Sequence, residues 1–411
     1  MEGHIRNFNM STWNKGSHPN YHAWGIGGGI GYYSPIVKGF QFGISGFTIH
    51  RIMANELYKE GVHQSRYELP LFDVENPDNK HDMDRIENLF VKYYLKNSSV
   101  KLGKMTLTTP FINPQDSRLR PNLQEGIWIE INDIKNMPIK GGIIWRNSPR
   151  GTVNWYGMGE SMGLYPTGYN YFNYDYAGQI QSDFIAINQI AYRLPNRSSV
   201  EFWNYYADRL FYLGFVKGVF RKSIDDHRTL KFGLQGLFQQ AIQDDHNTNL
   251  YMYKNEQALI GSGRIGIETK RHDIYLNGTY TGNHGRFVFP REWGREPFFT
   301  FIPRERLEGN GGVRAVSMNY HRRHKDSDLR SNISTGMFWY PELDNPLLNK
   351  YQTPSYLQTN VSINYNFHKA LDGLEINLLY AYKHSMKEIE YEQYHNKMHL
   401  HHFNLIIDYF F

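Results

Sequence analysis

The final segment of the chain alternates between apolar and polar side chains with a period of two. One face carries Phe403, Leu405, Ile407, Tyr409 and Phe411, and the other carries His402, Asn404 and Asp408. Because successive side chains of a strand point to opposite faces, this pattern predicts a strand with one apolar, aromatic face. An aromatic strand that ends the chain is typical of a sheet that closes on its first strand. The alternative is the edge strand of a soluble β-sandwich.

Strand-like segments recur along the whole chain, separated by turn residues such as Gly, Pro, Asn and Asp. We predict eighteen strands, at residues 3–13, 21–34, 39–51, 86–97, 99–109, 123–134, 139–147, 183–194, 199–208, 212–222, 229–242, 258–270, 272–283, 312–323, 331–340, 356–369, 374–388 and 398–411. Most are about ten residues or longer, the length that crosses a bilayer when a strand is tilted. Alternation is clean in the segment that holds Val361 and Ile363. It is poor around 183–208, where the sequence does not assign inner and outer faces.

The connections between these predicted strands alternate between short and long. The link 97–99 is short, whereas 52–85, 148–182 and 284–311 are long excursions. Short turns at one end and long loops at the other are what bacterial outer-membrane barrels show. An even number of strands also places both termini at the same end. We therefore predict one all-β domain over residues 1–411, a single 18-stranded antiparallel transmembrane β-barrel of the outer membrane with long extracellular loops.

Composition fits an exported barrel and excludes several other classes. Aromatic residues make up 16% of the chain and there is no cysteine, which suits an oxidising compartment. The mean hydropathy is −0.61, but alternation cancels the lipid-facing signal in such an average. The 45 basic and 40 acidic residues leave a net charge of +5, too balanced to indicate nucleic acid. No secretory signal follows Met1, so we expect that a signal peptide has been removed.

The interior of such a barrel decides its function. Eighteen strands enclose more space than side chains fill, so an aqueous channel remains unless loops fold inward. Gly25, Gly27, Gly29 and Gly31 alternate along one strand face. Either they leave room beside the wall for an inward-folded loop, or they ease bending of the strand. Both interpretations stay open.

Basic residues recur at positions that the alternation predicts to face the lumen. They are Arg6, Lys92, Lys101, Arg146, Lys217, Arg221 and Arg264. Together they would form a row of cations that lowers the barrier for anionic groups. Individually they would be solvated charges or partners of wall carboxylates such as Glu130 and Glu268. The sequence does not separate a functional row from scattered structural pairs.

The segment 110–122 combines prolines with charged residues and cannot continue a strand. Asp116, Ser117 and Arg118 lie between two prolines, which predicts a stiff, polar loop. The guanidinium groups of Arg118 and Arg120 are planar forks suited to a carboxylate. The same arginines would also pin the loop by salt bridges to the wall, and pinning is compatible with contact to a solute.

Several segments together resemble the OprD-type porins, a family of substrate-specific outer-membrane channels. They are Ile5-Arg-Asn-Phe8, Lys101-Leu-Gly-Lys104, Pro110-Phe-Ile-Asn-Pro-Gln-Asp-Ser-Arg-Leu-Arg-Pro121, Glu125-Gly126, Pro297-Phe-Phe-Thr300, Glu308-Gly-Asn-Gly-Gly312 and the terminal Phe411. The resemblance covers essentially the whole chain, and its most specific part is the Asp-Ser-Arg-Leu loop.

The resemblance implies a channel narrowed by two loops. In that family the third and seventh outer loops fold inward as an eyelet, which corresponds here to residues 110–122 and 284–311. The candidate constriction residues that the resemblance implies are Asp116, Ser117, Arg118, Glu125, Glu308 and Asn310. Further candidates from the wall and the loops are Arg6, Arg120, Arg146, Arg264, Arg304 and Arg306. The implied function is passive, selective diffusion of small charged solutes (carboxylate-bearing compounds, amino acids or short peptides) without a cofactor.

Other functions find less support in the residues. His399 and His401 share a face of the last strand, but no metal site is predicted. The chain has no nucleophile elbow and no phosphate-binding loop, so no enzyme is predicted. A barrel subunit of a larger uptake or export assembly and a porin for glycan oligosaccharides remain as alternatives. Expected partners are outer-membrane lipid, lipopolysaccharide and the solute, but not nucleic acid; monomer and trimer, with or without an accessory lipoprotein, stay open.

Overall fold

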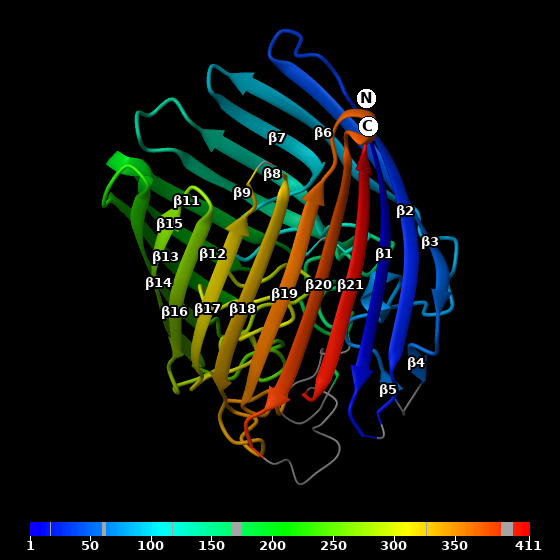
Figure 1. The fold of residues 1–411 in the computed structure, drawn as a ribbon, viewed down its shortest axis with the longest axis vertical. Helices are drawn as coiled ribbons and strands as arrows, with labels where there is room; N and C mark the ends of the chain where they lie inside the picture. The colour runs from blue at the N-terminus through cyan, green and yellow to red at the C-terminus, as the bar shows by residue number, and fades with distance from the viewer. Residues whose placement is uncertain (17, 60–62, 117, 166–174, 326, 388–397) are drawn as a thin grey trace.

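The computed structural model describes residues 1–411 except 17, 60–62, 117, 166–174, 326 and 388–397. Its main sheet is antiparallel and closes on itself, because the first strand pairs with both the second strand and the last (Figure 1). Eighteen strands complete the circle, and the two-residue β10 (Tyr156–Gly157) is added to it beside β9. The prediction of an 18-stranded antiparallel barrel is therefore confirmed.

The eighteen strands keep the order of the chain around the barrel. They are β1 (Glu2–Asn14), β2 (Tyr21–Tyr33), β3 (Phe40–Ala54), β6 (Arg85–Leu95), β7 (Ser98–Met105), β8 (Leu123–Ile131), β9 (Ile139–Ser148), β11 (Ile185–Leu194), β12 (Ser198–Ala207), β13 (Phe211–Ser223), β14 (Arg228–Ala241), β15 (Gln257–Thr269), β16 (His272–Thr281), β17 (Arg314–Arg323), β18 (Leu329–Trp339), β19 (Tyr356–Asn366), β20 (Leu374–Ser385) and β21 (Leu400–Phe410).

Only short elements lie outside these strands in the described part of the chain. They are the hairpin of β4 (Tyr58–Lys59) with β5 (His63–Gln64) and the 3-10 turns η1 (Leu69–Leu71), η2 (Pro195–Arg197) and η3 (Lys369–Leu371). None of the described residues forms a helix that is long and apolar enough to span a membrane.

The two chain ends seal the barrel. The backbone N–H of Gly3 donates to the carbonyl of Phe411 at 2.7 Å, and the N–H of Phe411 donates to the carbonyl of Gly3 at 3.0 Å. Both termini lie at the same end of the barrel (Figure 1). The connections at this end are short, for example the one between β6 and β7, whereas those at the other end include the long segments 55–84 and 282–313.

The alternation along the strands separates an apolar outer face from a polar inner face. In β19, Val361 and Ile363 are 38% and 39% exposed, while Gln358 and Asn360 are buried inside. Exposed aliphatic side chains on the outside of a closed sheet are the surface that a membrane barrel turns to lipid. The predicted faces of this strand are confirmed.

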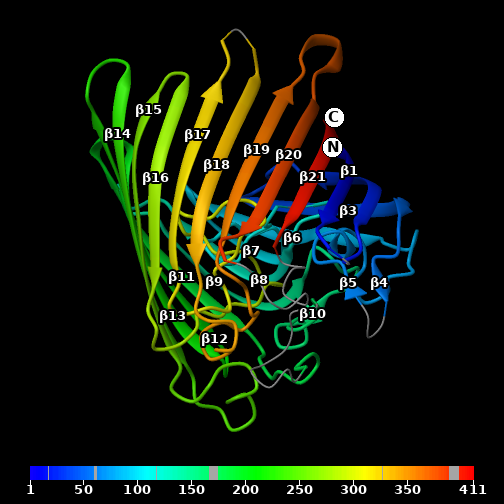
Figure 2. The same cartoon turned by 60° about the horizontal axis from the view of Figure 1, so that its bottom comes forward.

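One side of the interior is an apolar core built on Phe111 from the segment between β7 and β8. The Phe111 ring lies 5.4 Å from the ring of Tyr205 and 5.3 Å from that of Phe215, both on the wall. It also lies 5.5 Å from the ring of Phe289, which belongs to the segment between β16 and β17. Figure 2 shows chain segments occupying this part of the barrel interior. Because wall positions such as Ile187 face this core, both faces of β11 and β12 are apolar, which is why 183–208 alternates poorly.

The glycine face of β2 makes room for interior side chains. A Cβ atom on Gly25 would lie 2.7 Å from Leu119 and 2.9 Å from Phe72, which belong to two different inward segments. A Cβ atom on Gly27 or Gly29 would collide with the ring of Phe47 on the neighbouring β3. The space beside the wall at Gly25 is therefore filled by loop residues.

Candidate functional site

A cavity of about 980 Å³ lies inside the barrel next to the apolar core. It is lined by inward residues of β1 and β18 to β21, by the segments that precede β8 and β17, and by residues of the connections after β3, β9 and β18, such as Arg66, Arg150 and Tyr351. Its ten basic residues are Arg6, Arg66, Arg118, Arg150, Arg291, Arg295, Arg304, Arg306, Arg330 and Lys383, and its four acidic residues are Asp116, Glu305, Glu375 and Asp408. Glu308 and Glu296, just behind this lining, pair with Arg291 and Arg306, so ten basic residues stand against six acidic ones. The remaining surplus of basic groups favours anions in the cavity.

Asp116 is the centre of an arginine cluster on the cavity wall. Its carboxylate forms ion pairs with Arg150, with Arg304 at 2.8 Å and with Arg118 at 3.7 Å. Burial opposes ionisation of Asp116, but the charges of Arg150, Arg118 and Arg304 outweigh it and hold the pKa of this carboxyl well below its usual range. One carboxylate thus holds three guanidinium groups together, and their summed charge remains positive.

Arg304 links this cluster to the barrel wall. Its Nε donates to Nε2 of His402 on β21 at 2.9 Å, while its Nη1 reaches Asp116. Its backbone has a φ of 77°, a left-handed conformation that is costly for a residue with a side chain. Such strain persists only where the surroundings fix the residue in place, as the two partners of this side chain do.

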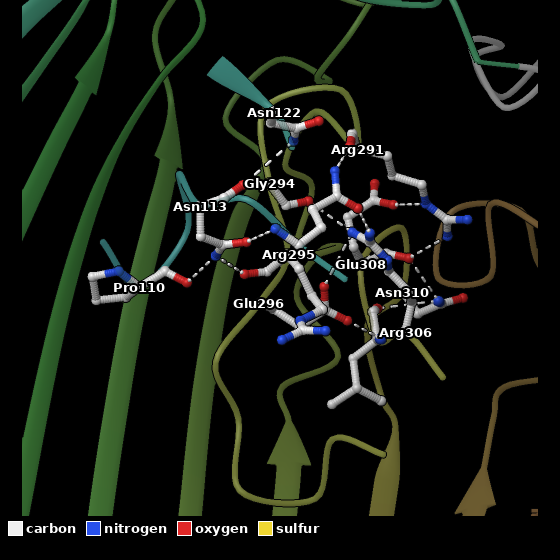
Figure 3. Close-up of polar contacts among 12 residues, drawn as sticks. Pro110, Asn113, Asn122, Arg291, Gly294, Arg295, Glu296, Arg306, Glu308 and Asn310 are labelled. Carbon is white, nitrogen blue, oxygen red and sulfur yellow. Dashed lines mark hydrogen bonds and ion pairs between the residues drawn. The ribbon is translucent and has the colours of Figure 1, made fainter. Parts of the chain in front are cut away.

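The two inward segments are joined to each other directly (Figure 3). Asn113 donates to the carbonyl of Arg295 at 2.8 Å, and Gln115 donates to the carbonyl of Arg291 at 2.7 Å. In return Arg306 donates to the side chain of Gln115 at 2.5 Å. These contacts cross between 106–122 and 282–313, so the position of either segment depends on the other.

Two of the Arg118 side-chain donors make no hydrogen bond to any described residue. Its side chain is almost fully buried, yet Nε and Nη1 make no hydrogen bond in the described part of the chain. The carbonyl of Arg118 accepts a 2.7 Å hydrogen bond from Nη1 of Arg6 on β1, which fixes its backbone to the wall. The Nε of Arg118 lies 3.7 Å from Oδ2 of Asp116, within ion-pair distance, and the residue lines the cavity, so Arg118 contributes a positive charge to the wall.

Glu305 is an acidic group of the cavity with unusual surroundings. Both of its carboxylate oxygens are buried without a hydrogen-bond partner among the described residues. Burial and the neighbouring carboxylate of Glu296 raise its pKa well above the usual value, against the opposing charges of Lys383 and Arg306. The group is therefore a neutral acid over part of the pH range in which free carboxyl groups are ionised.

The structure brings several of the predicted site residues to the cavity. Those that line it are Arg6, Asp116, Arg118, Arg304, Arg306 and Asn310. Ser117 lies outside the described residues. The remaining candidates have other surroundings.

Five predicted site residues do not line the cavity. Arg120 is buried and donates to the carbonyl of Met83 at 3.0 Å, so it fastens the segment after β3. Glu125 pairs with Lys104 at 3.3 Å on the wall, and Arg146 is exposed. Glu308 is buried against Arg291 at 2.6 Å. Arg264 donates to Asn277 at 2.6 Å and lines a second cavity.

Among the other predicted wall cations Arg221 forms a local pair, and the predicted wall carboxylates Glu268 and Glu130 also pair with Lys231 and Lys140. Arg221 and Lys231 lie 3.5 and 2.7 Å from Glu268, and Lys140 lies 3.2 Å from Glu130. These contacts match the interpretation of scattered structural pairs for this side of the wall.

The sequence reasoning missed several cavity residues, among them Arg150, Arg295, Arg330 and Lys383. Arg150 completes the group of arginines around Asp116. It lies in another segment of the chain, and no local sequence pattern indicates this contact. Arg330 is the second residue of β18. It lies two positions before Asn332 and therefore on the same inward face of the strand, and this alternation is the sequence signal that could have identified it.

Comparisons with known proteins agree with this architecture. The sequence profile of a family described as outer membrane porin, OprD family, matches residues 2–299. The structure of Pseudomonas aeruginosa OccK9 (OpdG) has 13% identity and a TM-score of 0.79, with 100% of this chain and 97% of that chain covered. P. aeruginosa OpdK with vanillate has 13% identity and a TM-score of 0.77, and Acinetobacter baumannii OccAB4 has 12% and 0.78, with the same coverage. At these identities the likeness shows the fold. No curated protein matches the sequence.

Proposed function

The chain belongs to the OprD family of outer-membrane porins, and on this premise we propose that it passes small carboxylate-bearing solutes by passive diffusion. As a member of this family it is a substrate-specific channel of the bacterial outer membrane and not an enzyme. The proposal concerns the class of solute and the residues that select it.

The observation that carries the proposal is the surplus of basic over acidic residues on the cavity wall, with Arg118 among the basic ones. Arginine is the residue that best matches a carboxylate, because its planar fork donates two parallel hydrogen bonds. The structure of P. aeruginosa OpdK with vanillate, itself a carboxylate, supports the same class of solute for this chain. Amino acids and short peptides carry the same group and fall within the class.

The narrowing of the channel is assigned to residues 110–122 and 284–311. Contacts between Asn113 and Arg295 and between Gln115 and Arg306 support this assignment, since they hold the two segments together at the cavity. A solute enters past the longer connections, passes Asp116 and Arg118, and leaves along the wall toward the short turns. In outer-membrane barrels the short turns face the periplasm.

Swelling of proteoliposomes in neutral, anionic and cationic solutes of similar size tests the proposal. A cation near the path stabilises an anion by about 1 kcal/mol even in water, so we expect anionic solutes to enter at least about fivefold faster than cationic ones. Equal rates for all three classes, or a preference for cationic solutes, would contradict it. Liposomes without protein provide the background rate.

A further inference from the structure

The cavity wall changes character toward the end of the barrel that carries the termini. Four inward asparagines line the cavity there: Asn332 on β18, Asn364 and Asn366 on β19, and Asn377 on β20. We call this set the amide wall. The three strands lie side by side in Figure 1, and their residues pair in continuous register. A wall of neutral amides offers both hydrogen-bond donors and acceptors, which an arginine row does not.

The amide wall is arranged in rows across the strands. Arg330 is directly opposite Asn364, and Asn364 is directly opposite Asn377. In the next row Asn366 is directly opposite Glu375. Side chains of directly opposite residues on one face are neighbours, with Cβ atoms roughly 5 Å apart. A cation, three amides and a carboxylate therefore share one patch of the cavity surface.

Much of the hydrogen-bonding capacity of this patch is unused. Asn377 donates to Oδ1 of Asn364, which leaves Nδ2 of Asn364 and Oδ1 of Asn377 unpaired among the described residues. Side chains of Arg330, Asn366 and Glu375 make no hydrogen bond or ion pair within that part of the chain. By contrast, Gln358 and Asn360, farther along the same face of β19, both donate to the carbonyl of Pro303. Within the amide wall, Asn364, Asn366 and Asn377 keep free groups, whereas Asn332 bonds to His321 and Ser362.

We propose that this patch is a subsite for polyhydroxylated carboxylates, the class to which sugar acids belong. The inference rests on the proposed passage of carboxylates and narrows it. Arg330 takes the carboxylate, Asn364 and Asn377 each pair with a hydroxyl group, and Asn366 and Glu375 receive further hydroxyls. A hydroxyl both donates and accepts, so it satisfies the two kinds of free group present here. A carboxylate without hydroxyls displaces water from these amides and returns no hydrogen bond.

Bi-ionic reversal potentials of the folded protein in planar bilayers test the subsite. Galacturonate and cyclohexanecarboxylate are six-membered-ring monocarboxylates that differ in their hydroxyl groups. At concentrations below saturation we expect the wild-type channel to favour galacturonate by roughly twofold to tenfold, the range expected for one additional hydrogen bond. The double variant Asn364→Leu/Asn377→Leu keeps the branched shape of the side chains with a somewhat larger volume and removes the amides, and it should bring this permeability ratio close to one.

Asn204→Leu is the matched control, because Asn204 bonds to Asn188 on the outside of the barrel. It should leave the ratio at its wild-type value. If the wild-type channel passes galacturonate and cyclohexanecarboxylate equally well but still prefers anions over cations, the subsite is wrong and the proposed function stands. Loss of the anion preference itself overturns the proposed function. A ratio that survives the double variant also removes the amide wall as its cause.

Discussion

Arg304 and Asp116 join the two inward segments of the barrel through an ion pair in which Nη1 lies 2.8 Å from Oδ2. Asp116 belongs to the segment before β8, and Arg304 to the segment before β17. The same guanidinium group reaches His402 on the wall at 2.9 Å. The shape of the cavity therefore depends on one carboxylate that balances several arginines.

Replacing Asp116 with Asn should loosen the inward segments. The change leaves Arg118, Arg150 and Arg304 close together without a counter-charge, and loss of a partner to buried donors costs about 1–3 kcal/mol. Faster hydrogen exchange in residues 106–122 than in the wild type is the expected result. Asp225→Asn removes a paired carboxylate in an exposed turn and serves as the control. Identical exchange in Asp116→Asn and the wild type would exclude the balancing role.

Arg118→Ala should lower the permeability of anions without unfolding the barrel. Arg118 lines the cavity, and removing one cation from the path weakens anion entry by about fivefold if the interaction is worth about 1 kcal/mol. Arg120→Ala is matched to it, because Arg120 is equally buried but bonds to the backbone of Met83 away from the cavity. That control should lower thermal stability and leave selectivity unchanged. Equal selectivity in the two variants would remove Arg118 from the solute path.

The selectivity of the channel should depend on pH through Glu305. Burial and the charge of Glu296 raise the pKa of Glu305, so the carboxyl is neutral below the raised value and negative above it. As pH rises through that pKa, a negative charge appears on the cavity wall and the preference for anions falls. Glu305→Gln should abolish this step in reversal potentials measured across the pH range. Glu342→Gln, at an exposed position, should keep the wild-type profile, and a step retained in Glu305→Gln would assign the titration elsewhere.

Replacing Gly25 on the barrel wall with Leu should displace the inward segments that pack against it. A Cβ atom at this position already lies 2.7 Å from Leu119, so a larger side chain overpacks the interior at a cost of roughly 1–3 kcal/mol. We expect a changed single-channel conductance with the barrel intact. Gly28→Leu is the control on the same strand, because the nearest atom to its Cβ is 3.9 Å away. Unchanged conductance in Gly25→Leu would show that the segments do not rely on this contact.

The strands could be predicted from the sequence because lipid and lumen impose a period of two on each of them. In β19, for example, the outward side chains Val361 and Ile363 are apolar, whereas the inward side chains Gln358 and Asn360 are polar. The rule fails at Ile187 because that residue faces loop aromatics instead of water. There the inner face is apolar because it packs against loop residues that are distant from Ile187 in the sequence.

The site was less predictable than the fold. Asp116 and Arg118 are predicted from a proline-bounded loop and a resemblance, and Arg304 only as a further loop candidate; all three line the cavity. Arg120 has the same residue type and the same loop, yet it points to the backbone of Met83. Which arginine reaches the lumen is decided by contacts between segments more than a hundred residues apart, such as that of Asn113 with Arg295, and no local pattern records them.

The central claim is that the excess of positive charge on the cavity wall selects anions. Reversal potential in a gradient of a potassium salt of a small carboxylate measures this directly, since potassium and the carboxylate drive the potential in opposite directions. The account predicts a potential of the sign set by the carboxylate, which becomes smaller in Arg118→Ala. A potential of the sign set by potassium would contradict it.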